Sequence, residues 1–254
     1  MATEPSRFPG ASVLAEARRL PEGTARGFVT FLRDEQTHFF LLTVVLGAGA
    51  GGVALGVRWL SAVVTHLTFG EWGGDIPQAV RHAPWFLRLL GPAFGGVVAG
   101  LLVQRAVRRA GSGGISGIME AVTLRHGFMS IRRALWLALG SVAALATGGS
   151  IGREGPVTGV SAALGSRLGR WFGLTEVRMR VLVAAGAGAG FAAVYNTPIA
   201  GTLFVLEVVA GSFSTDLIGP TVVAAVVATV LVRVVVWEGP IYDVPEFILR
   251  TPQE

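Results

Sequence analysis

The sequence contains no cysteine and no lysine, and it has few charged residues of either sign. Without cysteine, a disulfide scaffold and a thiolate-ligated metal site are both excluded. Charged residues make up 15% of the chain, against about 25% in ordinary soluble domains. A disordered chain would need low hydrophobicity together with high charge, which is the opposite pattern. The composition therefore favours a protein that is embedded in a membrane.

Glycine and long uncharged stretches are what the sequence has in abundance. Of its 254 residues, 36 are glycine, and 52% of the chain is hydrophobic. A helix needs about 20 apolar residues to cross the hydrocarbon core of a bilayer. Long apolar stretches, interrupted at most by single arginines, cover residues 39–69, 89–103, 134–152, 181–206 and 217–236. These stretches predict an all-α, polytopic membrane protein.

The 21 basic residues flank the apolar stretches and form no single stripe, so the pattern disfavours nucleic acid as a partner. Arginines are frequent before the first stretch and after the second, whereas Arg81 lies in the connection between them, with Arg88 at its edge. The positive-inside rule then puts the N-terminus in the cytoplasm. The membrane we expect is the plasma (inner) membrane. We expect a cytoplasmic segment over 1–38, a membrane region over 39–237 and a connector over 238–254.

Glycine and proline interrupt the apolar stretches in the middle of the chain. Clusters at 111–114, 148–155 and 186–190, and the Asn-Thr-Pro at 196–198, predict helix breaks. Broken helices place helix ends near the bilayer midplane in transporters, where they line a cavity. A helix N-terminus presents unpaired N–H groups and about half a positive charge. Several such starts that converge would form a selective anion site.

Glu154 is the strongest single candidate for a functional residue, because it lies inside the break that reads Gly-Arg-Glu-Gly-Pro over 152–156. A carboxylate within a membrane region is a functional hypothesis by default. At an anion-binding helix start, it can occupy the place of the anion and act as a gate. The alternative is that Glu154 pairs with Arg153 and only stabilises the helix dipole.

Three segments resemble signatures of the CLC family of chloride channels and proton-coupled chloride exchangers. Residues 148–156 resemble its gating-glutamate motif, 196–207 its Asn-x-Pro-x-Ala-Gly-x-x-Phe helix, and 111–122 its short helix opened by Gly-Ser-Gly. The resemblance implies the first half of an inverted-repeat fold with tilted and broken helices. It also implies transport of chloride or a similar small anion across a lipid bilayer, and a homodimer at full length. The implied anion-binding residues are Ser112, Gly113, Gly114, Gly152, Arg153, Glu154 and Gly155, with Glu154 as the gate.

Departures from the family pattern shape these expectations. The proline of the short helix is absent, so either Ser112 or Gly113 aligns with the anion contact. Exchangers carry a second glutamate after Glu207 that relays protons, whereas this chain has Val208, which favours conduction without proton coupling. The chain ends at Glu254, about where the family's first half stops. We therefore expect a truncated chain, a split gene or a fragment that does not conduct alone.

Several other functions remain as alternatives. A proton-coupled exchanger and a non-conducting membrane subunit are both compatible with the resemblance. Gly47, Gly49 and Gly52 spell a dinucleotide fingerprint, but they lie inside one uncharged stretch and not in a βαβ unit. Residues 148–152 have the spacing of a nucleophile elbow, but no histidine follows Ser150. We expect neither an enzyme nor a bound cofactor or metal.

Overall fold

The computed structural model describes residues 35–70, 76–107 and 113–236, and these residues form helices with no strand among them. Four long helices are α3 (Glu35–Phe69), α5 (Trp85–Val107), α9 (Glu176–Tyr195) and α11 (Thr215–Val236). Shorter ones are α4 (Ile76–His82), α6 (Gly114–Thr123), α7 (Ile131–Ala146), α8 (Glu154–Trp171) and α10 (Pro198–Phe204), which continues into the π-helical turn η2 (Val205–Val209). The predicted all-α class is confirmed, and the packing described below is that of the unit that begins at Thr43.

Helices α3, α5, α9 and α11 are long and apolar enough to cross a membrane. Two of the predicted apolar stretches do not form one long helix each. The stretch 134–152 is not one long helix, because α7 ends at Ala146 and Gly148 adopts a φ of 96°. The stretch 181–206 is divided, because Asn196 caps α9 with a left-handed backbone (φ 57°, ψ 32°) and Pro198 begins α10. Both divisions fall at helix breaks that the sequence predicts, at 148–155 and 196–198.

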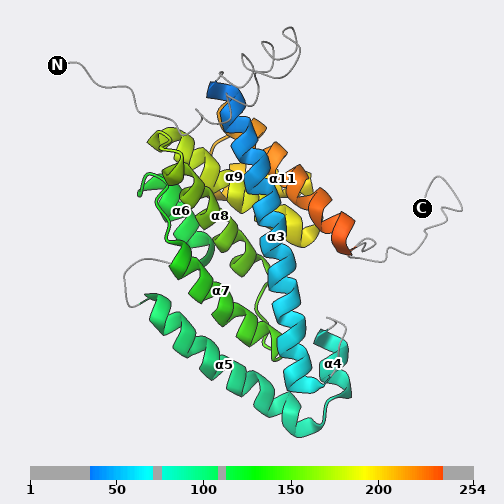
Figure 1. Ribbon diagram of the computed structural model, residues 1–254. Helices are drawn as coiled ribbons and strands as arrows, with labels where there is room; N and C mark the ends of the chain where they lie inside the picture. The colour runs from blue at the N-terminus through cyan, green and yellow to red at the C-terminus, as the bar shows by residue number, and fades with distance from the viewer. Residues whose placement is uncertain (1–34, 71–75, 108–112, 237–254) are drawn as a thin grey trace, which may run out of the picture. The chain divides into compact units, whose positions relative to one another are not determined.

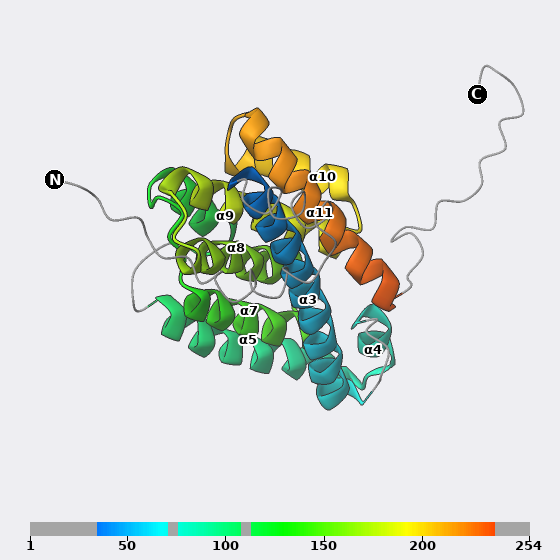
Figure 2. The ribbon, with the colours of Figure 1, turned by 45° about the horizontal axis from the view of Figure 1, so that its top comes forward.

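Helix α8 packs between α7 and α9, and α9 in turn packs against α10 and α11 (Figures 1 and 2). Small residues make this possible, since they let helix backbones approach closely where apolar burial gives no advantage over lipid. A Cβ added to Gly165 of α8 would collide with the carbonyl of Leu182, and one added to Gly186 of α9 would collide with the carbonyl of Ser161. The two helices therefore cross with backbone against backbone.

The glycines at 186, 188 and 190 do not mark a helix break, so that prediction is wrong. They are buried inside α9. A Cβ at Gly188 would lie 3.0 Å from the carbonyl oxygen of Gly201 in α10, and one at Gly190 would lie 3.0 Å from the Cα of Thr158 in α8. Glycine serves two purposes in membrane helices, breaks and close crossings, and this cluster serves the second.

The Gly47–Gly51 region of α3 also serves packing. A Cβ at Gly47 would lie 2.6 Å from the carbonyl oxygen of Ala224, and one at Gly51 would lie 3.0 Å from that of Ala228, both in α11. These glycines are four residues apart on one continuous helix, so they face the same neighbour. A dinucleotide fingerprint requires a strand and a turn here, and the helix excludes it.

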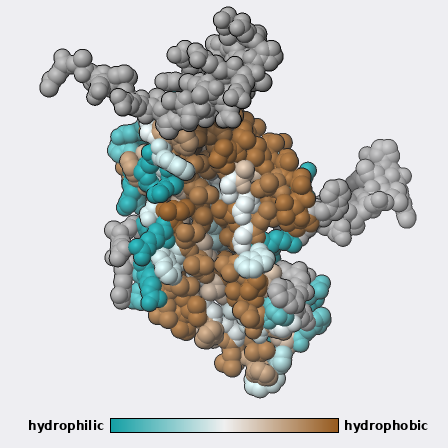
Figure 3. Space-filling view, in the orientation of Figure 1, coloured by the Kyte–Doolittle hydropathy of each residue, from teal (hydrophilic) through white to brown (hydrophobic). Residues whose placement is uncertain are grey.

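Large apolar side chains remain exposed on the outer helices, and Figure 3 shows a face that is mainly hydrophobic. They include Val45 and Trp59 on α3, Leu89, Phe94 and Leu101 on α5, and Val230 and Val234 on α11. Hydrophilic residues gather along the left edge of that view. Such a distribution suits a chain whose outer helices contact lipid or further protein.

The connection between α6 and α7 is tied to α8 by one buried side chain, Ser166. Its hydroxyl donates to the carbonyl oxygen of Gly127 at 2.7 Å and accepts from the backbone N–H of Met129 at 2.8 Å. Arg170, one turn further along α8, donates to the carbonyl oxygen of Met129 at 3.1 Å. This connection forms one wall of the site described below.

Replacing Ser166 with alanine should lower the free energy of unfolding by about 1–3 kcal/mol, because it leaves buried backbone groups without partners. The measurement is the thermal unfolding midpoint of the purified protein in detergent. Ser141→Ala is the matched control, since among the described residues the Ser141 hydroxyl bonds only to the carbonyl of Leu137 in its own helix. Equal midpoints for the two variants would contradict the expectation.

Candidate anion-binding site and gate

Two helices begin at the glycine-rich breaks that the sequence predicts. α6 begins at Gly114 after Gly113, and α8 begins at Glu154 after Arg153. Gly113 has no side chain to cap α6, and the side chain of Arg153 makes no bond to the first turn of α8. Gly114 has a φ of 65°, a conformation that glycine adopts without a steric cost. Ser112, the other predicted anion contact, lies outside the described residues.

A cavity of about 680 Å³ brings these two helix starts together. Its glycine-rich walls come from the start of α6, with Gly113 before it and Gly114 and Gly117 within it, and from α8, with Gly155, Pro156 and Gly159. The absence of side chains at the glycines leaves the backbone of both first turns facing open space. Of the predicted site residues, Gly113, Gly114 and Gly155 therefore share one cavity, whereas Gly152, Arg153 and Glu154 are not part of its wall.

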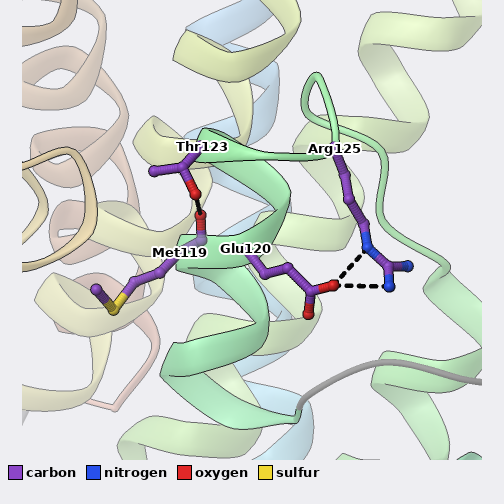
Figure 4. Close-up of polar contacts among 4 residues, drawn as sticks. All are labelled: Met119, Glu120, Thr123 and Arg125. Atoms are coloured by element: carbon purple, nitrogen blue, oxygen red, sulfur yellow. Dashed lines mark hydrogen bonds and ion pairs between the residues drawn. The ribbon is translucent and has the colours of Figure 1, made fainter.

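Arginines give this cavity a positive wall. Arg105 of α5 and Arg132 and Arg133 of α7 line it, and so do Glu120 and Arg125. The last two neutralise each other, because Nε and Nη2 of Arg125 both lie 2.7 Å from Oε1 of Glu120 (Figure 4). The three other arginines outnumber the one carboxylate, so the charge of the lining favours an anion.

A second pocket, of about 100 Å³, is lined by arginines from three separate segments. These are Arg58 of α3, Arg153 before α8 and Arg233 of α11, with Asn196 beside them. The Nε of Arg233 donates to the side-chain oxygen of Asn196 at 2.5 Å. Arg153 lines this pocket and Gly155 lines the larger cavity. Glu154 is thus the residue at which the chain passes from one pocket to the other.

The carboxylate of Glu154 is folded back over Gly152. A Cβ at position 152 would collide with both carboxylate oxygens, so only glycine leaves room for this conformation. The hydroxyl of Tyr195, the last residue of α9, donates to Oε2 of Glu154 at 3.0 Å. Among the described residues, no ion pair joins Glu154 to Arg153, so the alternative in which these two merely pair is not what the structure shows.

Sequence reasoning missed Tyr195 as well as two arginines of the smaller pocket, Arg58 and Arg233. Tyr195 carried one signal that could have found it, since it directly precedes the Asn-Thr-Pro break. Val208, the position of the missing proton-relay glutamate, is a 40% exposed residue of η2, and it lines neither pocket.

Comparison with known proteins identifies the family of the chain. The sequence profile of the voltage-gated chloride channel family matches residues 95–254, which is more than half of the chain. The chain belongs to this family. Its members are channels and transporters and not enzymes, and the chain is an integral, multi-pass membrane protein of the CLC type. The recognition of the family from sequence is confirmed.

Two curated relatives are longer than this CLC-family chain. It is 41% identical over 171 residues to a ClcB-like protein of Ralstonia nicotianae, which covers 66% of this chain and 40% of that protein. It is 31% identical over 194 residues to the voltage-gated ClC-type chloride channel ClcB of Escherichia coli (strain K12). This match covers 75% of this chain and 46% of the Escherichia coli protein. The chain thus spans less than half the length of these relatives.

A solved structure shows the same fold. The crystal structure of a slow cyanobacterial Cl⁻/H⁺ antiporter aligns with a TM-score of 0.66 at 22% identity, over 82% of this chain and 49% of that one. The fold predicted for this CLC-family chain, one half of the CLC architecture, is thereby confirmed.

Proposed function

We propose that this chain supplies one half of an anion pathway in a CLC-type protein that transports chloride or a similar small anion. The observation that carries the proposal is the position of Glu154 between two arginine-lined pockets, one of which contains two helix N-termini. Such N-termini bind anions through backbone N–H groups without requiring a full positive charge in contact. The site residues proposed are Gly113, Gly114 and Gly155, with Glu154 as the gate.

The larger cavity faces the cytoplasm in this proposal. Arg105 lies at the end of α5, and Arg132 and Arg133 lie at the start of α7. By the positive-inside rule, these helix ends are cytoplasmic. An anion in the cavity would meet the amides at the starts of α6 and α8, and the smaller pocket would lie further along its path.

Glu154 works as a gate by competition in this proposal. Its carboxylate bears the same charge as the transported ion, and the start of α8 attracts either of them. In the structure the carboxylate lies over Gly152 and does not line the larger cavity. Rotation of this side chain toward the cavity would place it among the backbone N–H groups and exclude the anion.

We further propose conduction without proton coupling, because the side chain of Val208 cannot carry a proton. A proton-coupled exchanger is the second candidate. It is favoured by the similarity in fold to a structure described as a Cl⁻/H⁺ antiporter. A homodimeric assembly in the complete protein is proposed on family membership.

The test uses the complete protein that carries this chain, reconstituted in liposomes loaded with chloride. We expect chloride release, followed with a chloride-selective electrode, and no accompanying proton movement in a pH recording of the same vesicles. For residues 1–254 alone we expect no release, because they cover 49% of the antiporter structure that has the same fold. Empty liposomes provide the baseline. A fixed proton-to-chloride ratio would establish the exchanger instead, and absence of chloride flux in the complete protein would refute both.

A further inference from the structure

We propose that Tyr195 is a positioning residue for the gate, and that its hydroxyl holds the carboxylate of Glu154 over Gly152, outside the anion cavity. This inference rests on the proposed function, since it assigns a partner to the group proposed there as the gate. The Tyr195 hydroxyl donates to Oε2 of Glu154 at 3.0 Å, and the two residues are 41 positions apart in the sequence. Tertiary packing of α8 against α9 therefore creates the contact.

The ring of Tyr195 is supported by other aromatic rings. The centroid of Phe191, one turn earlier in α9, lies 4.7 Å from that of Tyr195. Phe204 of α10 stacks on Phe191 with centroids 4.4 Å apart and planes 13° from parallel. Contacts of this kind are favourable beyond the area they bury, and they restrict the rings. The Tyr195 hydroxyl that bonds to Glu154 is therefore carried by a ring whose position is restricted.

The residue after Tyr195 is also held. Asn196 adopts a left-handed backbone conformation, and its side-chain oxygen accepts a hydrogen bond from Nε of Arg233 at 2.5 Å. Nη2 of Arg233 lies 3.5 Å from the backbone carbonyl oxygen of Asn196. The end of α9 is thus fastened to α11, which holds in place the backbone that carries the Tyr195 ring.

Glu154 has no comparable second anchor. Among the residues that the structure describes, the Tyr195 hydroxyl is the one hydrogen-bond donor to its carboxylate. A hydrogen bond to an ionised acceptor is stronger than one between neutral groups. Loss of that donor leaves the carboxylate free to rotate toward the first turn of α8, where unpaired N–H groups attract it. Phenylalanine at position 195 would keep the ring contacts and remove only the donor.

Tyr195→Phe in the complete protein tests the proposal by two readouts. We expect the chloride flux from liposomes to fall several-fold, up to about tenfold for the loss of one hydrogen bond to a charged group. Infrared spectra with ¹³C-labelled glutamate give the second readout. The carboxylate band that disappears in Glu154→Gln belongs to Glu154, and we expect its frequency to shift in Tyr195→Phe.

The Glu154→Ala background separates positioning from a merely structural role. There, Tyr195→Phe has no carboxylate to act on and should leave the flux unchanged. An equal fall in both backgrounds, an unchanged flux in Tyr195→Phe alone, or an unshifted infrared band would overturn the proposal. If the unmodified protein moves no chloride, the proposed function fails by itself, and the infrared comparison decides whether Tyr195 positions Glu154.

Discussion

Replacing Glu154 with alanine should raise the chloride flux of the complete protein on the order of tenfold, the rate change that about 1.4 kcal/mol of barrier supplies. The carboxylate competes with the anion for the N–H groups at the start of α8, and alanine removes the competitor while keeping the helix. The start of α8 lacks a side-chain cap, so the anion gains access to unpaired donors. The measurement is chloride release from liposomes at matched protein content.

Glu176→Gln is the matched control for this substitution. Glu176 also lies in the first turn of a long helix, α9, but its carboxylate pairs with His126 at 2.8 Å and its side chain is 63% exposed. It lines neither pocket. We expect the chloride flux of the Glu176→Gln variant to equal that of the unmodified protein. Equal fluxes for Glu154→Ala and Glu176→Gln would remove Glu154 from the role of gate.

Replacing Gly186 with valine should prevent the recovery of folded protein. The carbonyl of Ser161 in α8 already occupies the space that a Cβ at position 186 requires. The obstacle is backbone and not the end of a flexible side chain, so relief requires α8 and α9 to separate. Overpacking of a well-packed site costs about 1–3 kcal/mol, and we expect a loss of about 3 kcal/mol or more here. Fluorescence-detected size exclusion in detergent, together with the thermal midpoint, measures the outcome.

Gly100→Val provides the control, because Gly100 lies in another long apolar helix, α5, and no atom of the described residues is within 4 Å of an added Cβ. We expect this variant to elute as the unmodified protein does, with a similar thermal midpoint. If Gly186→Val were as stable as Gly100→Val, the close crossing of α8 and α9 would not be a determinant of the fold.

Much of the fold could be predicted because the signals are local. Scarcity of charge marks the apolar helices, and the sequence Asn-Thr-Pro at 196–198 predicts the division between α9 and α10 that the structure contains. The starts of α6 and α8 likewise follow their glycine-rich breaks. The end of α7 at Ala146, followed by the turn at Gly148, also falls at the predicted glycine cluster of 148–155.

The candidate site could be predicted only in part. Glu154 and the glycines at the starts of α6 and α8 are visible as residues in unusual sequence surroundings. Their grouping is not, since the cavity also requires Arg105 from α5 and Arg132 and Arg133 from α7. The anion-binding roles of these residues remain predictions that the flux experiments test.

By itself, the sequence determined that the chain is an all-α membrane protein of the CLC family and where three of its helix breaks fall. Composition and Gly-Pro chemistry act within a few residues, so they can be read without knowing what lies nearby in space. Only the tertiary structure decided that the glycines at 186–190 serve a helix crossing, because that depends on the carbonyls of α8 and α10. It also decided that Tyr195 meets Glu154, because a hydrogen bond across 41 positions exists only once α8 and α9 have packed.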